Sequence, residues 1–227
     1  MNETAKTRRL FSTRELALLA GRGIDIGCGS EPIVPNAQPF DVQDGDANDI
    51  TRFVEGPFEF VYSSHCLEHM KDARAAVREW WKLVKPGGHL VVIVPDEDLY
   101  EQGFWPSRFN RDHKWTFTIA KSTSWSPVSI NLLDLVQGLP GASVQDIRLQ
   151  DSAYRRELMS HGPGSIRASD ALRRWFHRRA RGLFGRKHEQ DAPVETAHRA
   201  GRPVDQTQYR DVVAQILCIV RKDPSRA

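Results

Sequence analysis

Cysteine is scarce in this sequence, and long apolar runs are missing from it. The three cysteines, Cys28, Cys66 and Cys218, are odd in number, lie far apart and form no Cys-x-x-Cys pair, so neither a disulfide framework nor a cysteine zinc site is expected. No run approaches the roughly 20 apolar residues of a membrane span, and the first residues contain no apolar secretory core. The sequence therefore predicts a cytoplasmic protein.

The length and composition are those of one globular domain. Of the 227 residues, 40% are hydrophobic and 27% are charged, which is ordinary for a soluble chain that can bury a sizeable core. No internal repeat divides the sequence. We therefore expect a single domain over residues 1–227.

Positive charge is concentrated in one segment. Residues 155–187 contain ten Lys/Arg and two acidic residues, a net charge of +8; because the whole chain carries +3, the remainder carries −5. This asymmetry indicates an attachment with a role of its own. The segment precedes the last expected strand, so we predict a basic insertion over residues 152–207, between the final two strands.

Apolar strands alternate with helical patterns along the chain. Residues 23–26 and 58–62 have the patterns of short strands, and residues 89–94 form a continuous apolar run typical of a parallel strand covered on both faces. Asp72 can cap a helix that ends near Val84. The pattern predicts an α/β fold with a mostly parallel sheet and helices on both faces. Further helices are expected over 13–20 and 131–139, and further strands over 40–42, 144–149 and 212–220.

Glycines follow the first strand, where the chain must turn. Gly27 and Gly29 let the backbone bend tightly against a bound ligand. A dinucleotide fold requires a third glycine at the position that Pro32 occupies here. A glycine turn that holds no ligand is the structural alternative.

The pattern Asp25-x-Gly27-x-Gly29 resembles motif I of the class I S-adenosylmethionine-dependent methyltransferases. The segments Tyr62–His69 and Leu83–Gly88 resemble later parts of that family, in its small-molecule and ubiquinone-biosynthesis-like branch. The resemblance covers residues 23–95 and, more loosely, 206–222. It implies a Rossmann-like fold with an antiparallel last strand, and an enzyme that uses S-adenosylmethionine.

The resemblance also implies a set of cofactor contacts. The turn of Gly27, Cys28 and Gly29 would contact the methionine part of the cofactor, while Asp25 would orient that turn or bind the amino group through water. Asp41 would accept hydrogen bonds from the ribose hydroxyls. The remaining expected contacts are Asp46 and the amide of Ala47 at the adenine edge, together with Ser64. Asp41 and Asp46 could instead be acids that cap turns.

Two histidines are the predicted catalytic residues. His65 follows the strand that should point at the cofactor, and it could remove the proton of an acceptor hydroxyl or amine. Its structural alternative is to cap the loop or pack on the cofactor. His113 comes from a later segment rich in aromatics.

His65-x-x-Glu68-His69 resembles the Glu-x-x-Glu-His motif of metal-assisted O-methyltransferases, with His65 in place of the first glutamate. The segment Asp112–Lys114 could supply a further ligand, and such an ion would acidify an acceptor hydroxyl. In many relatives without a metal, Glu68 and His69 serve as structural hydrogen-bonding residues. The sequence therefore allows a divalent metal without favouring it.

Two further segments bear on the acceptor and on partners. Six aromatic residues fall within residues 96–118, a predicted lid that either closes a small core or stacks on the acceptor. Apolar residues share one face of a basic helix within residues 165–187. That helix could dock on the domain, contact an anionic membrane surface, or bind nucleic acid. Nucleic acid is the least favoured of the three, because no RNA-binding module accompanies the helix.

The predicted function is therefore methyl transfer from S-adenosylmethionine to a small-molecule, sugar or lipid-linked acceptor, and oxygen is the predicted methylated atom. The alternative is a cofactor-binding or membrane-associated interaction protein that kept the fold without transfer. In either case the predicted location is cytoplasmic, with peripheral contact at the membrane as an option. The acceptor itself has no code in the sequence.

Overall fold

The structure is a computed structural model of the 227-residue chain, and it describes residues 3–119, 121–163, 195–197, 202–209 and 211–224. The helical part predicted for the basic segment lies outside these residues. So does the part of it expected to contact a membrane. The single-domain organisation and the insertion remain predictions.

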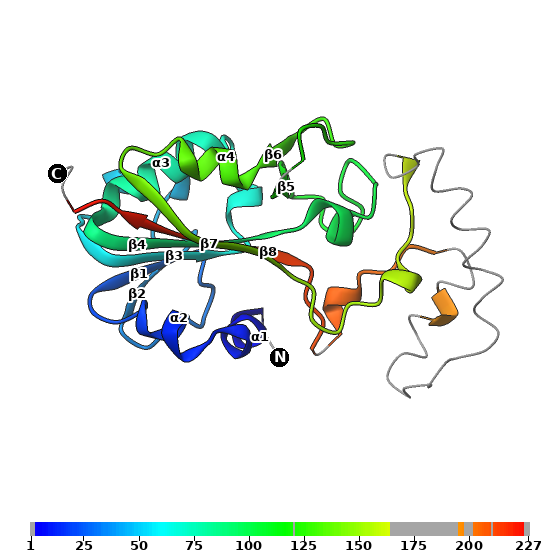
Figure 1. Cartoon of the computed structure of the whole chain (residues 1–227), viewed down its shortest axis with the longest axis horizontal. Coiled ribbons are helices and arrows are strands. Elements are labelled where there is room, and N and C mark those ends of the chain that lie inside the picture. Colours follow the sequence, from blue (N-terminus) through cyan, green and yellow to red (C-terminus); the bar gives the residue numbers. More distant parts are fainter. Residues whose placement is uncertain (1–2, 120, 164–194, 198–201, 210, 225–227) are drawn as a thin grey trace.

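A six-stranded sheet in the order β2-β1-β3-β4-β8-β7 forms the centre of the molecule (Figure 1). The strands β2, β1, β3 and β4 run parallel to one another, whereas β8 runs antiparallel to both β4 and β7. The strands are β1 (Gly23–Ile26), β2 (Ala37–Phe40), β3 (Phe58–Ser64), β4 (Val84–Pro95), β7 (Ala142–Gln150) and β8 (Gln215–Lys222). This arrangement confirms the predicted α/β fold with its antiparallel last strand.

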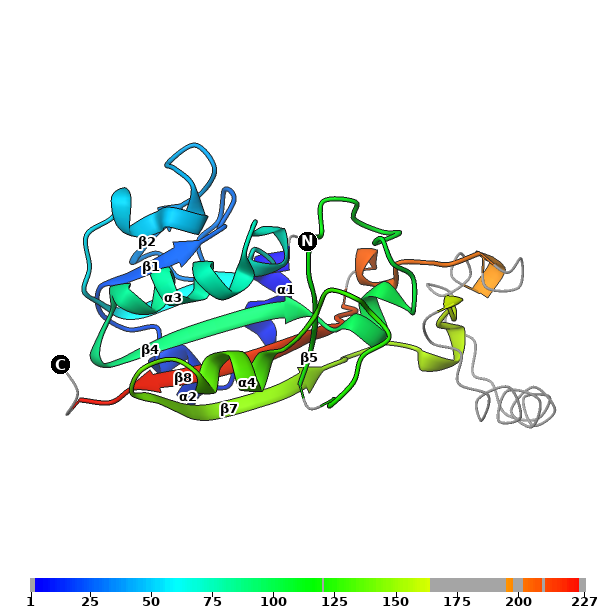
Figure 2. The ribbon, with the colours of Figure 1, turned by 90° about the horizontal axis from the view of Figure 1, so that it is seen from above.

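Helices cover both faces of the sheet. On one face lie α3 (Ala73–Leu83) and α4 (Leu132–Gln137), and on the other lie α1 (Glu3–Leu10) and α2 (Thr13–Ala17). Figure 2 shows α3 and α4 above the sheet with α1 and α2 partly hidden beneath it. Two apolar clusters correspond to these layers, one containing Trp80 of α3 and one containing Phe11 and Leu19 beside α2.

Local signals explain where the helices begin. Ser12 and Glu15 form a capping box at the start of α2, in which each side chain accepts a hydrogen bond from the backbone N–H of the other residue. Asp72 accepts hydrogen bonds from the amides of Arg74 and Ala75 at the start of α3. The helix α2 ends at Ala17 and is shorter than the 13–20 segment that the sequence predicts.

The start of β4 differs from the prediction. The sequence predicts a strand over residues 89–94, but β4 already begins at Val84. Val84 pairs with Phe58 and His89 pairs with Phe60, so the residues between them bulge out of the ladder. Gly87 has a φ of +78°, which glycine adopts readily.

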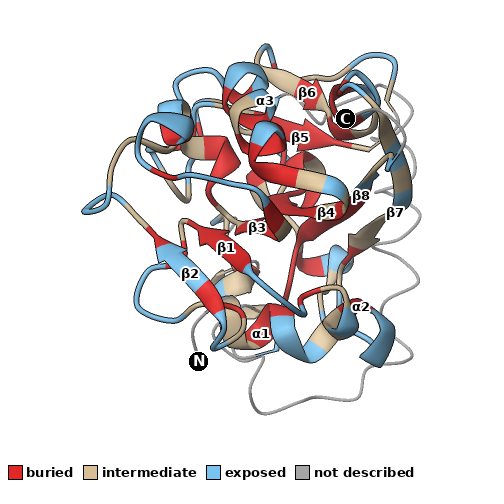
Figure 3. Cartoon of the chain, turned by 90° about the vertical axis from the view of Figure 1, so that its left-hand side faces the viewer, coloured by how far each residue is buried: buried red, intermediate tan, exposed pale blue. Residues whose placement is uncertain are grey.

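Other boundaries shift as well. The second strand is Ala37–Phe40 rather than residues 40–42, and the last strand begins at Gln215 rather than Val212. β2 is an edge strand, and its middle residues, Gln38 and Pro39, are exposed (Figure 3). Proline is tolerated at a sheet edge because its missing N–H costs no central hydrogen bond. The connection from β1 to β2 contains no helix.

The predicted lid folds around short elements. It contains the π-helix η3 (Glu97–Glu101) and β5 (Thr116–Thr118), and β5 pairs with β6 (Ser129–Asn131). The fully buried Glu97 accepts hydrogen bonds from Thr116, Lys121, Ser124 and Ser129. The remaining short helices are η1 (Ala47–Arg52), η2 (Leu67–His69), η4 (Arg156–Leu158) and η7 (Gln206–Gln208). Among the helices that the structure describes, none has the length and apolarity to span a membrane.

Candidate active site

The carboxyl ends of three parallel strands meet at one edge of the sheet. The glycine turn follows β1. Ser64 is the last residue of β3 and His65 follows it, while Asp96 follows β4. Ile26 of β1 pairs with Ser63 of β3, which places the turn beside the loop that carries His65. In open α/β sheets, ligands bind at this edge.

The two glycines of the turn occupy different surroundings. Both have positive φ angles, +78° at Gly27 and +59° at Gly29. A Cβ atom on Gly27 would lie 2.7 Å from the Cβ of Cys66, whereas a Cβ on Gly29 would meet no atom within 4 Å. Gly27 is therefore required for packing, while Gly29 has one open side that a ligand can approach.

Two acidic residues hold this turn. Asp41 accepts a hydrogen bond from the amide of Gly29, with an N to Oδ2 distance of 2.6 Å. Asp25 is 2% exposed and accepts a hydrogen bond from the amide of Ile33 at 2.7 Å, so it holds the connection to β2. Burial raises the pKa of Asp25 to about 7; the hydrogen bond from Ile33 opposes this rise, and the nearby charge of Asp41 adds to it.

Asp46 and Ala47 lie at the start of η1. Asp46 accepts a hydrogen bond from the amide of Asn48, and its other oxygen lies 2.8 Å from Nζ of Lys71. The hydrogen bond from Lys71 holds the pKa of Asp46 well below its usual range. The carbonyl of Ala47 accepts a hydrogen bond from the indole of Trp80. Asp46 thus caps the turn at the start of η1, which was the structural alternative to a contact with adenine. That contact stays a prediction.

Two buried hydroxyl groups on β3 have no hydrogen-bond partner within the described part of the chain. They are the phenol of Tyr62 and the hydroxyl of Ser64. Tyr62 pairs in register with Asp25 of β1, directly before the glycine turn. Buried polar groups without partners are uncommon, and a ligand with polar atoms at this edge would satisfy them.

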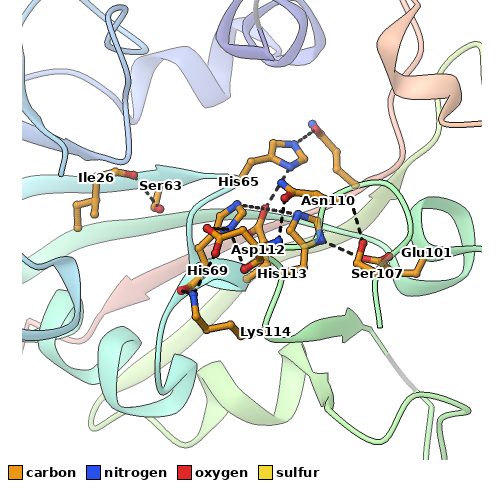
Figure 4. Close-up of polar contacts among 12 residues, drawn as sticks. Ile26, Ser63, His65, His69, Glu101, Ser107, Asn110, Asp112, His113 and Lys114 are labelled. Carbon is orange, nitrogen blue, oxygen red and sulfur yellow. Dashed lines mark hydrogen bonds and ion pairs between the residues drawn. The ribbon is translucent and has the colours of Figure 1, made fainter. Parts of the chain in front are cut away.

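A carboxylate surrounded by imidazoles lies next to the turn (Figure 4). Oε1 of Glu68 lies 3.6 Å from Nδ1 of His65 and 4.0 Å from the Nε2 atoms of His69 and His113. Glu68 is 1% exposed, and neither of its oxygens accepts a hydrogen bond from a described residue. The structure thus brings His113 of the lid to the residues that the sequence singled out near His65.

Charge explains the ionisation of this carboxylate. Burial by itself would raise the pKa of Glu68, but the imidazole of His65 and the charge that His113 and His69 can carry lower it below its usual range. Glu68 is therefore an anion in a dry environment at neutral pH. Such a buried charge requires a positive partner.

Sequence comparison identifies the family. A family model described as a methyltransferase domain matches residues 3–180. The chain belongs to the methyltransferase domain family. The match and the fold together confirm the prediction of an S-adenosylmethionine-dependent methyltransferase.

Solved structures share the fold of this methyltransferase at low identity. A proposed methyltransferase from Bacillus halodurans C-125 is 16% identical, with 98% of this chain and 100% of that chain covered and a TM-score of 0.51. A second similar structure is the complex between the Haloferax volcanii Trm112 methyltransferase activator and a proposed methyltransferase, at 12% identity, with 96% and 92% covered and a TM-score of 0.50. The search among curated proteins found no match.

The structure of the methyltransferase adds residues that the sequence did not indicate. Nδ1 of His113 lies 2.8 Å from Oε1 of Glu101, and both side chains are buried. Nε2 of His65 lies 2.9 Å from Oε1 of Gln215, a residue of β8. Neither Glu101 nor Gln215 lies near its partner in the sequence, so no local pattern could have found them. The roles of the predicted cofactor and catalytic residues themselves stay predictions.

Proposed function

We propose that this methyltransferase transfers the methyl group of S-adenosylmethionine to an oxygen atom of a small-molecule acceptor, including a sugar or the polar end of a lipid-linked compound. The observation that carries the proposal is the position of the imidazoles around Glu68, directly after β3 and beside the glycine turn. Methyl transfer is an in-line displacement, so the acceptor oxygen must approach the methyl group opposite the sulfonium sulfur. A hydroxyl acceptor must also lose its proton.

The residues at the sheet edge fit the cofactor. The open side of Gly29 lets a ligand approach the backbone closely. Asp41 lies beside it, and its carboxylate can accept hydrogen bonds from hydroxyl groups. The unpartnered hydroxyls of Tyr62 and Ser64 would gain partners from a polar ligand. When bound, S-adenosylmethionine supplies an electrophilic methyl group. The chain's own residues orient it and exclude water.

His65 is the proposed general base. Its φ of 53° lies in the left-handed region, which is costly for a residue with a side chain. Strain of this kind is concentrated at functional sites, and here it accompanies a side chain that points to Glu68. Because Oε1 of Gln215 accepts a hydrogen bond from Nε2, Nδ1 is the nitrogen of His65 that can take up and release a proton, and it lies on the side of Glu68.

The proposal is tested by binding and then by transfer. Purified protein is titrated with S-adenosylmethionine by calorimetry, and Asp41→Ala is the binding variant, with exposed Asp134→Ala of α4 as its matched control. The protein is then incubated with the donor and a panel of hydroxyl and amine acceptors, and products are identified by mass spectrometry. Methylated amines without methylated hydroxyls would contradict O-methylation. A folded protein that fails to bind the donor would contradict the whole proposal.

A further inference from the structure

We propose that Glu68, His69 and His113 bind one divalent transition-metal ion. The three side chains offer ligand atoms that all lie within 4.8 Å of one another, and two of the side chains are buried while His69 is half-buried. Any role of the ion in activating the acceptor rests on the proposed function. The binding of the ion does not.

The outer contacts of the two histidines decide which nitrogen of each ring carries a proton. Nδ1 of His113 faces the carboxylate of Glu101 at 2.8 Å, and Nδ1 of His69 faces the carbonyl and the carboxylate of Asp112 at 3.3 and 3.2 Å. These partners accept hydrogen bonds and cannot donate them, so each Nδ1 carries the hydrogen. A neutral imidazole then presents its lone pair on Nε2.

Both Nε2 atoms face Glu68. Each lies 4.0 Å from Oε1 of Glu68, too far for a hydrogen bond. Metal–ligand bonds of about 2.1 Å place two ligand atoms roughly 3 to 4 Å apart, so the separation has room for an ion. Two lone pairs and a carboxylate oxygen that face one another repel unless a cation lies among them.

Buried charge leads to the same conclusion. The carboxylates of Glu68 and Glu101 are 1% and 2% exposed, and His113 lies between them. Each glutamate also has an oxygen without a hydrogen-bond partner among the described residues. A buried carboxylate oxygen without a hydrogen-bond partner is costly, and an ion held by Glu68 would satisfy it. The contact from Glu101 to His113 has the form of the carboxylate–histidine pairs that orient metal ligands.

The ligand set selects the kind of metal. Imidazole suits Zn²⁺, Co²⁺ and related ions, whereas Mg²⁺ prefers oxygen ligands and water. Three protein ligands with two imidazoles and one carboxylate leave coordination positions open, as in catalytic rather than structural sites. His65, at 3.6 Å from the same Glu68 oxygen, lies beside this position.

The experiment uses the full chain after treatment with a chelator and dialysis. Co²⁺ is added and followed by its visible absorption and by calorimetry, with far-UV circular dichroism measured in parallel to report folding and S-adenosylmethionine binding measured separately. We expect one Co²⁺ bound at the cluster and displaced by Zn²⁺, but retained in roughly a hundredfold excess of Mg²⁺. His69→Ala and Glu68→Gln should remove binding at this site.

Two further variants separate ligands from their supports. Glu101→Gln should weaken Co²⁺ binding by roughly 10- to 100-fold, because it alters only the group that orients His113. His89→Ala of β4, a histidine outside the cluster, should leave binding unchanged.

Two results would overturn the proposal. One is a folded wild type that binds no Co²⁺, whether or not it binds S-adenosylmethionine. The other is Co²⁺ binding that is equal in wild type and His69→Ala, which would place the ion elsewhere. Failure of the proposed function differs from both, because it appears as absent donor binding or absent product whatever the metal result.

Discussion

Nε2 of His65 lies 2.9 Å from Oε1 of Gln215, a residue 150 positions later in the chain. Gln215 is 1% exposed, and its amide nitrogen contacts Oε1 of Gln150 at 2.7 Å and Oγ1 of Thr7 at 3.4 Å. The orientation of His65 therefore depends on two strands and on helix α1. A residue held in this way from outside its own loop is suited to proton transfer, which requires a fixed geometry.

Removing His65 should affect the chemical step more than binding. We expect His65→Ala to lower kcat for a hydroxyl acceptor by roughly 10²- to 10⁴-fold, with the Kd for S-adenosylmethionine nearly unchanged. Steady-state kinetics and calorimetry provide the two readouts, and His89→Ala is the matched control. Equal kcat values for the variant and the wild type would assign His65 a structural role.

Removing Gln215 should act through His65. Gln215→Leu removes the oxygen that accepts the Nε2 hydrogen bond and fills the buried position with an apolar side chain. The kcat should therefore fall by roughly 10-fold, and the pH profile of kcat should shift. In a His65→Ala background the same change should cost little. A double-mutant cycle measures this, and additive losses would contradict the positioning role.

The glycines of the turn should separate packing from ligand approach. Gly29→Ala is expected to cost about 1 to 2 kcal/mol of unfolding free energy because of its φ of +59°, and to weaken S-adenosylmethionine binding at least tenfold. Gly27→Ala should destabilise more, because its Cβ would lie 2.7 Å from the Cβ of Cys66.

Gly87→Ala is the control for backbone strain, since Gly87 has a φ of +78° and an added Cβ would lie no closer than 3.9 Å to Pro224. It should lose stability as Gly29→Ala does while keeping donor affinity. If Gly29→Ala and Gly87→Ala bind the donor equally well, the turn does not contact the cofactor.

Asp25 should make stability depend on pH. Its folded pKa is about 7 against an ordinary value of 3.8, so between these values the folded state binds more protons than the unfolded state. The contribution is full below pH 3.8 and is lost as pH rises to about 7, a loss of roughly 4 kcal/mol. Denaturant unfolding at several pH values should show a smaller decline in Asp25→Asn. The exposed Asp134→Asn should follow the wild type.

Glu97 should be a major support of the lid. Its carboxylate is fully buried and accepts hydrogen bonds from Lys121 at 2.8 Å and from three hydroxyl groups. Replacement by alanine removes an acceptor that three hydroxyl groups and Lys121 share, while Lys121 keeps its contact with Asp98, and we expect a loss of about 3 to 5 kcal/mol. Asp98→Ala removes a 44% exposed partner of the same lysine and should cost about 1 kcal/mol or less. Equal losses in urea unfolding would contradict this assignment.

Local chemistry explains which elements the sequence could predict. Asp72 caps α3 through amides two and three residues away, and the apolar run of β4 reflects a strand covered on both faces. These signals lie within a few residues. The bulge at Lys85–Gly88 has no such local signal, because its form depends on pairing with β3.

The candidate site was partly predictable for the same reason. The glycine turn and the His65–His69 segment are local patterns, and the structure places both at the carboxyl edge of the sheet. Glu101 and Gln215 reach the histidines through the folded lid and through β8. Their contacts are made by tertiary structure, so no spacing in the chain encodes them.

The exposed Pro39 of β2 also limits how two molecules can meet. It lies in the last strand on that side of the sheet, and a proline has no N–H to donate to an added strand. A second copy of the chain therefore cannot lengthen the sheet with a regular ladder there. An extended segment of another molecule therefore fits poorly along the edge that ends beside Asp41 and the glycine turn.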